Sequence, residues 1–219
     1  MTTGWKLATG TGYCEVDGDL VFLDLVRDKY FALRGQDRAA FERLRAGEPN
    51  DSEAMGRLVA TGFLARSSEP TKLDPASPHI PANDLSAVAD GPTSLRMGFA
   101  ASRALRWARR SMRPNRIAST VEAMRNAKLR LGVPGAEAAV RGIASSYAAS
   151  RWMARTPPRC LIDALALDHI LLSHGLGARL VFGVRLSPFA AHCWLQSPGA
   201  VLTGISAEAR NFTPILAIG

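Results

Sequence analysis

The pattern of apolar and polar positions predicts a chain that opens with short strands, continues through amphipathic helices and closes with a mixture of both. The opening runs are short, apolar or alternating, and are separated by turn residues such as Asp17-Gly18-Asp19, which is typical of a β-meander. Two amphipathic helices follow, and Asp51 can cap the second. These strands and helices are expected at residues 13–16, 20–25, 29–33, 36–45 and 53–61.

A proline-rich segment at residues 67–94 separates this opening from the middle of the chain. Its composition is that of an extended linker, with Pro70, Pro75, Pro78, Pro81 and Pro92 among Ser and Asp residues. Beyond it, apolar residues at helical spacing predict helices over residues 102–112, 117–131 and 136–153. This region is very basic, so its surface is either a solvated helix face or a docking face for an acidic partner.

The final part of the chain begins with Pro157-Pro158, which interrupt any preceding helix. Cys160 then opens a strongly apolar run that predicts a buried helix ending before Gly175. Strands are expected over residues 179–186, 190–195 and 200–203, and a turn at Ser197-Pro198-Gly199 joins the last two in a hairpin.

Composition limits the class of protein. With 219 residues, 47% of them hydrophobic, the chain can form one medium domain or two small ones. No apolar run is long enough to cross a bilayer and the N-terminus has no signal-peptide pattern, so we expect a cytoplasmic protein. Three cysteines do not indicate a disulfide framework. The net charge of +8 is compatible with nucleic acid, a membrane surface or an acidic protein as partner, and does not choose among them.

Cys160 and His192 are the strongest candidates for catalysis. A cysteine in the first turn of a helix lies beside free backbone N–H groups, which together with the helix dipole favour a thiolate. A histidine on a following strand can act as the general base for such a thiol. Taken singly, each residue also has an ordinary structural interpretation, as a small buried hydrophobe or a hydrogen-bonded histidine. His169 and His174 are not joined by a convincing set of ligands, so no metal site is predicted.

Several short motifs occur together in the final part of the chain. They are Cys160-Leu161, Ala164-Leu165-Ala166-Leu167, Gly183-Val184-Arg185, Pro188-Phe189 and Ala191-His192-Cys193-Trp194. In this combination the chain resembles the B proteins of lasso-peptide biosynthesis, whose C-terminal part is a transglutaminase-like, papain-related cysteine peptidase. The resemblance implies that Cys160 is the nucleophile and His192 the general base.

The same resemblance implies an aspartate on the strand that follows the histidine. That strand contains Thr203-Gly204 here and no carboxylate. Glu208, Asn211 or a backbone carbonyl could orient His192 instead. The thiol and the imidazole perform the bond-making steps, so losing only the orienting group need not abolish the chemistry.

The opening part of the chain carries a second resemblance, in residues 21–24, 29–33 and 39–41. It resembles the winged helix-turn-helix peptide-recognition elements that are related to the pyrroloquinoline quinone peptide chaperone. This implies that the leader of a precursor peptide adds as a strand to the edge of the third strand. The implied leader-binding residues are Lys29, Tyr30, Phe31, Ala32 and Leu33 on that strand, with Met55 and Leu58 on the facing helix.

Two alternatives bear on this module. Tyr30 and Phe31 point to opposite faces of a strand, so at least one of them fills a core. A winged fold could also bind DNA, but its second helix carries Asp51 and Glu53 against Arg57 alone, which disfavours nucleic acid.

The expected fold is α+β. It combines a winged helix-turn-helix leader-recognition module at residues 1–66, a linker at 67–94 and a transglutaminase-like, papain-like cysteine peptidase domain at 95–219. The resemblance implies a peptidase that removes the leader of a lasso precursor before an asparagine-synthetase-like cyclase closes the macrolactam. No cofactor is expected, and ATP use is assigned to the cyclase because this chain has no Gly-x-x-x-x-Gly-Lys loop. The alternative is a catalytically weak scaffold that presents the precursor.

Overall fold

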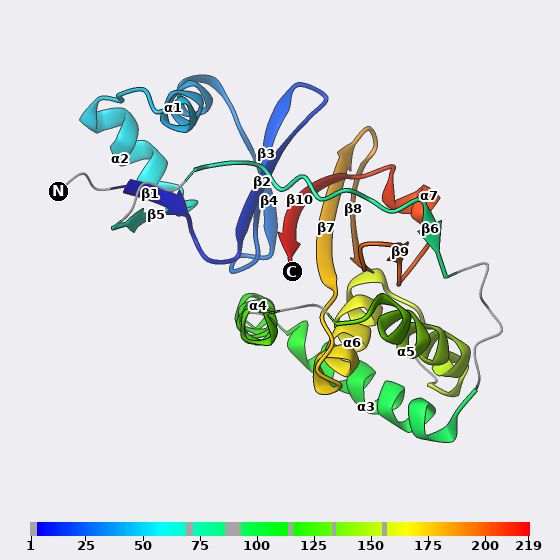
Figure 1. Ribbon diagram of the computed structural model, residues 1–219. Helices are drawn as coiled ribbons and strands as arrows, with labels where there is room; N and C mark the ends of the chain where they lie inside the picture. The colour runs from blue at the N-terminus through cyan, green and yellow to red at the C-terminus, as the bar shows by residue number, and fades with distance from the viewer. Residues whose placement is uncertain (1–3, 69–71, 86–92, 114–115, 133–134, 155–156) are drawn as a thin grey trace.

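Figure 1 shows the computed structural model of the chain, a mixed arrangement of helices and sheets. The structure describes residues 4–68, 72–85, 93–113, 116–132, 135–154 and 157–219. None of the helices within these ranges is both long enough and apolar enough to cross a membrane.

The N-terminal part contains the predicted three-stranded meander. Its strands are antiparallel neighbours in the order β2 (Thr11–Val16), β3 (Asp19–Asp24) and β4 (Lys29–Leu33). The turns need residues that tolerate positive φ, and Asp17, Gly18 and Asp28 supply them. A two-stranded sheet that was not predicted pairs β1 (Gly4–Leu7) with β5 (Leu64–Ser67).

Two helices cover one face of this meander, α1 (Gly35–Ala46) and α2 (Ser52–Ala60). The predicted cap is present, because the Asp51 side chain accepts a hydrogen bond of 2.7 Å from the Ala54 N–H. Tyr13, Phe22 and Phe41 are buried between the sheet and the helices, and their rings lie 5.0–5.4 Å apart.

The C-terminal part places helices against a five-stranded sheet of order β10-β7-β8-β9-β6. Its elements are α3 (Leu95–Ser111), α4 (Ile117–Leu131), α5 (Glu137–Ser150), the 3₁₀ turn η2 (Arg151–Met153), α6 (Cys160–Ser173), β7 (Arg179–Leu186), β8 (Phe189–Gln196), β9 (Ala200–Val201), α7 (Ser206–Ala209) and β10 (Thr213–Ile218). β6 (Asn83–Asp84) comes from the proline-rich segment and pairs in parallel with β9.

Three details differ from the predicted elements. α3 begins at Leu95 rather than at residue 102, since the Ser94 side chain caps it by accepting from the Met97 N–H. The predicted helix 136–153 changes to a 3₁₀ turn after Ser150. β9 is shorter than the predicted strand 200–203, and β10 was not predicted.

The N-terminal meander is buried on both faces. Cys14, Val21 and Leu23 alternate with the residues that face α1 and α2, and they join the core formed by α3–α6 and the second sheet. β2 lies against β10, as Figure 1 shows, and the contact is backbone to backbone. A Cβ at Gly12 would come within 2.1 Å of the Ile215 carbonyl oxygen, so only glycine permits this approach.

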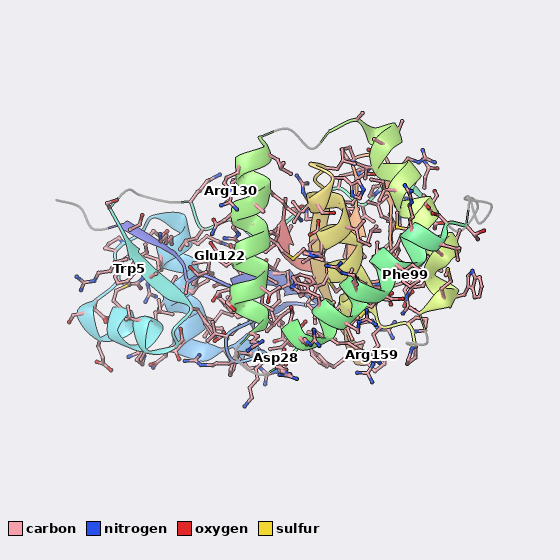
Figure 2. The ribbon with its side chains drawn as sticks, turned by 90° about the horizontal axis from the view of Figure 1, so that it is seen from below. Trp5, Asp28, Phe99, Glu122, Arg130 and Arg159 are labelled. Atoms are coloured by element: carbon pink, nitrogen blue, oxygen red, sulfur yellow. The ribbon has the colours of Figure 1, made fainter. Side chains whose placement is uncertain are left out.

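α4 passes between the two parts, as Figure 2 shows with Glu122 and Arg130 labelled along it. Lys128 on this helix forms an ion pair of 2.7 Å with Asp168 of α6, and the two side chains are 3% and 0% exposed. Lys128 also donates a 3.1 Å hydrogen bond to the Ile218 carbonyl of β10. The contact between Lys128 and Asp168 is close enough for an ion pair but does not have hydrogen-bond geometry, and among the described residues the Asp168 carboxylate accepts no hydrogen bond. Burial raises the pKa of Asp168 to about 6, and Lys128 partly opposes that change.

The described part of the proline-rich segment is held to both parts of the chain. Tyr13 donates a hydrogen bond to the Leu73 carbonyl on the N-terminal side. Further along, Gln196 donates to the His79 carbonyl at 2.7 Å, and Ser206 donates to the Pro81 carbonyl at 2.6 Å. This stretch is therefore fixed on the surface of the molecule at several points.

Candidate functional site

Cys160 is the first residue of α6 and is the exposed cysteine, whereas Cys14 and Cys193 are buried. The helix behind it is held on several sides, because Leu165, Leu167 and other side chains of α6 are fully buried. A rigid helix thus presents the thiol to solvent at its N-terminus, where free N–H groups favour an anion.

Asp163 fixes the first turn of this helix. Its carboxylate accepts hydrogen bonds from the Arg159 N–H at 2.9 Å, the Tyr147 hydroxyl at 3.0 Å and the Arg151 guanidinium at 2.6 Å. Sequence reasoning did not identify this positioning residue. The signal that could have found it is an acidic side chain in the first turn of a helix, a common capping feature.

His192 lies on β8 in a half-buried aromatic setting. Its ring stacks on Phe212 and Trp194 at centroid distances of 5.1 and 5.8 Å. Gly183 lies opposite His192 in the sheet, and a Cβ there would meet Trp194 and Phe212 at less than 3 Å. Burial lowers the pKa of His192, and the charge of Glu208 partly opposes this change.

The position expected to hold an aspartate lies beside the imidazole. The Nε2 atom of His192 is buried and, among the described residues, has no hydrogen-bond partner. A Cβ built on Gly204 would lie 3.8 Å from this nitrogen. Glu208 influences His192 through its charge, but the described hydrogen bonds join neither Glu208 nor Asn211 to the ring. The imidazole therefore lacks an orienting partner at the place where the family pattern predicts one.

Cys160 and His192 belong to neighbouring elements, but no hydrogen bond joins them among the described residues. His192 shares a face of β8 with Trp194, whereas Cys193 points into the core that α6 enters. β8 pairs with β9 only where Gln196 faces Val201, so within the described chain the edge beside His192 has no strand neighbour. His192 therefore lies on the face of β8 opposite to the one against which α6 packs, and the chain at Gly204 lies beside its ring.

Residues 95–217, more than half of the chain, match the transglutaminase-like superfamily. The chain belongs to this superfamily. The matched part includes both Cys160 and His192, and the superfamily typically works through a cysteine and includes cysteine peptidases. The predicted transglutaminase-like part is thereby confirmed. No curated protein and no solved structure matches the chain.

The predicted leader-binding residues lie before the part that matches the transglutaminase-like superfamily, so their role stays a prediction. β4 pairs with β3, and its other edge has no strand partner among the described residues. Of the predicted set, Lys29 and Ala32 are exposed, Tyr30, Phe31 and Met55 are half-buried, and Leu33 and Leu58 are buried. Leu58 contributes to the core beneath α2, and a leader could therefore reach it only indirectly.

Two of the other histidines of this transglutaminase-like protein, His169 and His174, have ring contacts on α6 or α3. His169 stacks on Trp107 at 4.2 Å, and the His174 ring nitrogen Nδ1 lies 2.9 Å from the Ile170 carbonyl. Across the described ranges, no three His, Cys, Asp or Glu side chains gather as a metal site.

The basic face predicted for the middle of the chain lies on α3. Arg96, Arg103, Arg106 and Arg110 line an open groove between α3 and α6 together with Phe99 and Trp107. No ion pair within the described chain involves these four arginines. They leave a positively charged surface on α3.

Proposed function

We propose that this protein is a leader peptidase of the lasso-peptide type. Its N-terminal module captures the leader of a ribosomal precursor, and Cys160 cleaves the peptide at the junction between leader and core. The observation that carries the proposal is the exposed thiol at the first residue of a buried helix, in a superfamily that uses such cysteines. The cytoplasm is the expected location, since a ribosomal precursor is made there.

The chemistry follows from the two side chains. His192 takes the proton of Cys160, and the sulfur attacks the carbonyl carbon of the last leader residue to form a tetrahedral oxyanion. The imidazolium then gives its proton to the departing amine, which frees the core and leaves the leader as a thioester. Water, deprotonated by His192, attacks that thioester, and the leader leaves as a carboxylate while the thiol is restored.

The arrangement of the two parts supports this route. Among the described residues one edge of β4 has no strand partner, and such an edge can accept a peptide strand through main-chain hydrogen bonds. A leader that pairs antiparallel to β4 would end beside Lys29 and Tyr30, and the Tyr30 ring contacts Phe189 at the start of the His192 strand. The C-terminal end of the leader would then emerge next to the elements that carry the thiol and the imidazole.

The proposed partner is an asparagine-synthetase-like cyclase that consumes the freed core. Closing the macrolactam uses ATP, and we assign that step and its nucleotide to the cyclase. The basic groove on α3 is a suitable surface for an acidic region of such a partner.

The test is to incubate the purified protein with its precursor and to follow leader release by mass spectrometry. Cys160→Ala and His192→Ala should each abolish release, whereas Cys14→Ala, a matched change of a buried cysteine outside the site, should keep it. Cleavage by Cys160→Ala at the wild-type rate would refute the nucleophile. Adding the cyclase to parallel reactions tells whether cleavage needs it.

A precursor-presenting scaffold is the second candidate, and one observation favours it. The Nε2 atom of His192 has no partner among the described residues where the family pattern predicts an aspartate. A scaffold would bind the leader and release no product, even with the cyclase present. Leader binding by fluorescence anisotropy, measured beside the cleavage assay, separates the two functions.

A further inference from the structure

Tyr30 connects the N-terminal module to the surroundings of the candidate nucleophile. Its side chain packs on the core of the C-terminal part, whereas that of Phe31 packs on the core beneath α1 and α2. The Tyr30 ring meets the Phe189 ring edge to face, with 5.5 Å between centroids. Phe189 opens β8 and is 57% exposed, so this aromatic pair lies at the surface.

The pair lies on the face of β8 against which α6, the helix that begins with Cys160, packs. Phe189 and Cys193 lie on the same face of β8, since they are four residues apart on one strand, and α6 packs against Cys193. Burial raises the pKa of Tyr30, and charge on Cys193, Asp28 and Cys160 raises it further. Charge on Cys160 likewise adds to the raised pKa of buried Cys193. Tyr30, Cys193 and Leu161, the residue after Cys160, pack on the same core, and the charge effects agree with that placement.

We propose that Tyr30 and Phe189 form an aromatic ledge beside Cys160, and that the ledge receives an apolar side chain of the peptide substrate next to the scissile bond. The inference rests on the proposed function and adds a specificity-determining residue from the N-terminal module to the same site. Aromatic side chains suit this role, because they offer a large apolar surface and lose little conformational entropy on binding. A peptide held against the ledge keeps its carbonyl near the thiol.

The position of the ledge can be tested without any substrate. Cys160 is the exposed cysteine, so labelling by N-ethylmaleimide, followed by intact-mass spectrometry, reports on its surroundings. Tyr30→Ala should raise the labelling rate several-fold, because it removes a ring that limits approach to the thiol. Tyr30→Phe keeps the ring and should label at the wild-type rate.

Phe31→Ala is the matched control, since the neighbouring ring is lost from the opposite face of the same strand. It should leave the labelling rate of Cys160 close to that of wild type. An equal rise in both alanine variants would mean that the module has loosened as a whole, and no rise in Tyr30→Ala would mean that its ring does not border the thiol. Either result overturns the ledge.

The substrate role is tested with the precursor. Tyr30→Ala should raise KM for cleavage several-fold more than it lowers kcat, and a precursor whose apolar residue beside the scissile bond is replaced by alanine should lose the same factor with the wild-type protein and little more with Tyr30→Ala. Losses that simply multiply when the two changes are combined would assign Tyr30 to the leader groove and overturn the ledge. Failure of the wild-type protein to cleave refutes the proposed peptidase, whereas the labelling rates still decide whether Tyr30 borders Cys160.

Discussion

Gly204→Asp should give His192 the carboxylate partner that it lacks. A Cβ at this position lies 3.8 Å from His192 Nε2, and a carboxylate oxygen beyond it can reach a hydrogen-bonding distance of about 2.8 Å. A hydrogen bond to a charged group contributes about 1.5 to 3 kcal/mol. That range corresponds to roughly a tenfold to hundredfold shift toward the imidazolium form.

The substitution also has a cost. Gly204 has a φ of 81°, a region that disfavours side chains by about 1 to 2 kcal/mol and penalises aspartate and asparagine least. Gly204→Asn is therefore the matched control, because it carries a similar backbone strain and an amide of the same shape without the charge. Urea unfolding of both variants measures the shared loss of stability.

The assay is an NMR titration of the four imidazoles, with His192→Gln identifying the signal of interest. In the wild-type protein burial lowers the pKa of His192, and the new carboxylate should move it upward. The reasoning is refuted if His192 titrates at the same pH in the aspartate and asparagine variants. If the peptidase proposal is also right, the aspartate variant should cleave the precursor faster than the asparagine variant.

Other substitutions test the packing that holds the site. Gly12→Val would place a side chain 2.1 Å from a backbone oxygen of β10 and should destabilise the protein by about 1 to 3 kcal/mol or more in urea unfolding, whereas Gly56→Ala, in open space, should not. Asp163→Asn should lower the free energy of unfolding by about 1 to 3 kcal/mol, because it weakens the hydrogen bonds to Arg151 and Arg159. It should also speed amide hydrogen exchange in the first turn of α6, and an unchanged exchange rate would contradict the positioning role of Asp163. Lys128→Met should lower the free energy of unfolding, measured in urea, by about 3 to 5 kcal/mol, because it leaves the Asp168 charge buried without a partner. The double variant with Asp168→Leu should recover most of that loss, and equal losses in the two variants would refute the argument that Lys128 compensates the buried charge. The pKa of Asp168 is raised from 3.8 to about 6 by burial, so its contribution to stability is complete below about pH 4 and is lost as the pH rises through 6. Asp168→Asn should remove this slope from urea midpoints recorded between pH 4 and 7, and an unchanged slope would rule out this carboxyl as its source.

The helix behind Cys160 could be predicted because its residues are apolar on nearly every side, which only a buried helix satisfies. β10 was missed for a local reason. Pro214 interrupts its strand pattern, and in the sheet this residue lies where the pairing with β7 shifts register. The start of α3 was missed because Gly98 weakens a helical pattern. Its missing side chain instead makes room for Met153, whose sulfur would lie 2.3 Å from a Cβ there.

The candidate site was predictable only as separate residues. Cys160 and His192 could be named from short motifs, and Gly204 from the missing aspartate, since each is a local pattern. The alternation of Tyr30 and Phe31 predicted that at least one ring fills a core, and in the structure both are half-buried and pack on different cores from opposite faces of β4. The contact between Tyr30 and Phe189 joins residues that are far apart in the chain, and no periodicity in the sequence carries that information.

The docking of β2 on β10 and the fastening of the proline-rich segment have a practical consequence. Limited proteolysis of that segment should yield a nicked species whose two fragments elute together in gel filtration, because the shared core rather than the peptide connection keeps them associated. Transplanting this module onto another enzyme would accordingly require rebuilding the interface as well as splicing the chain.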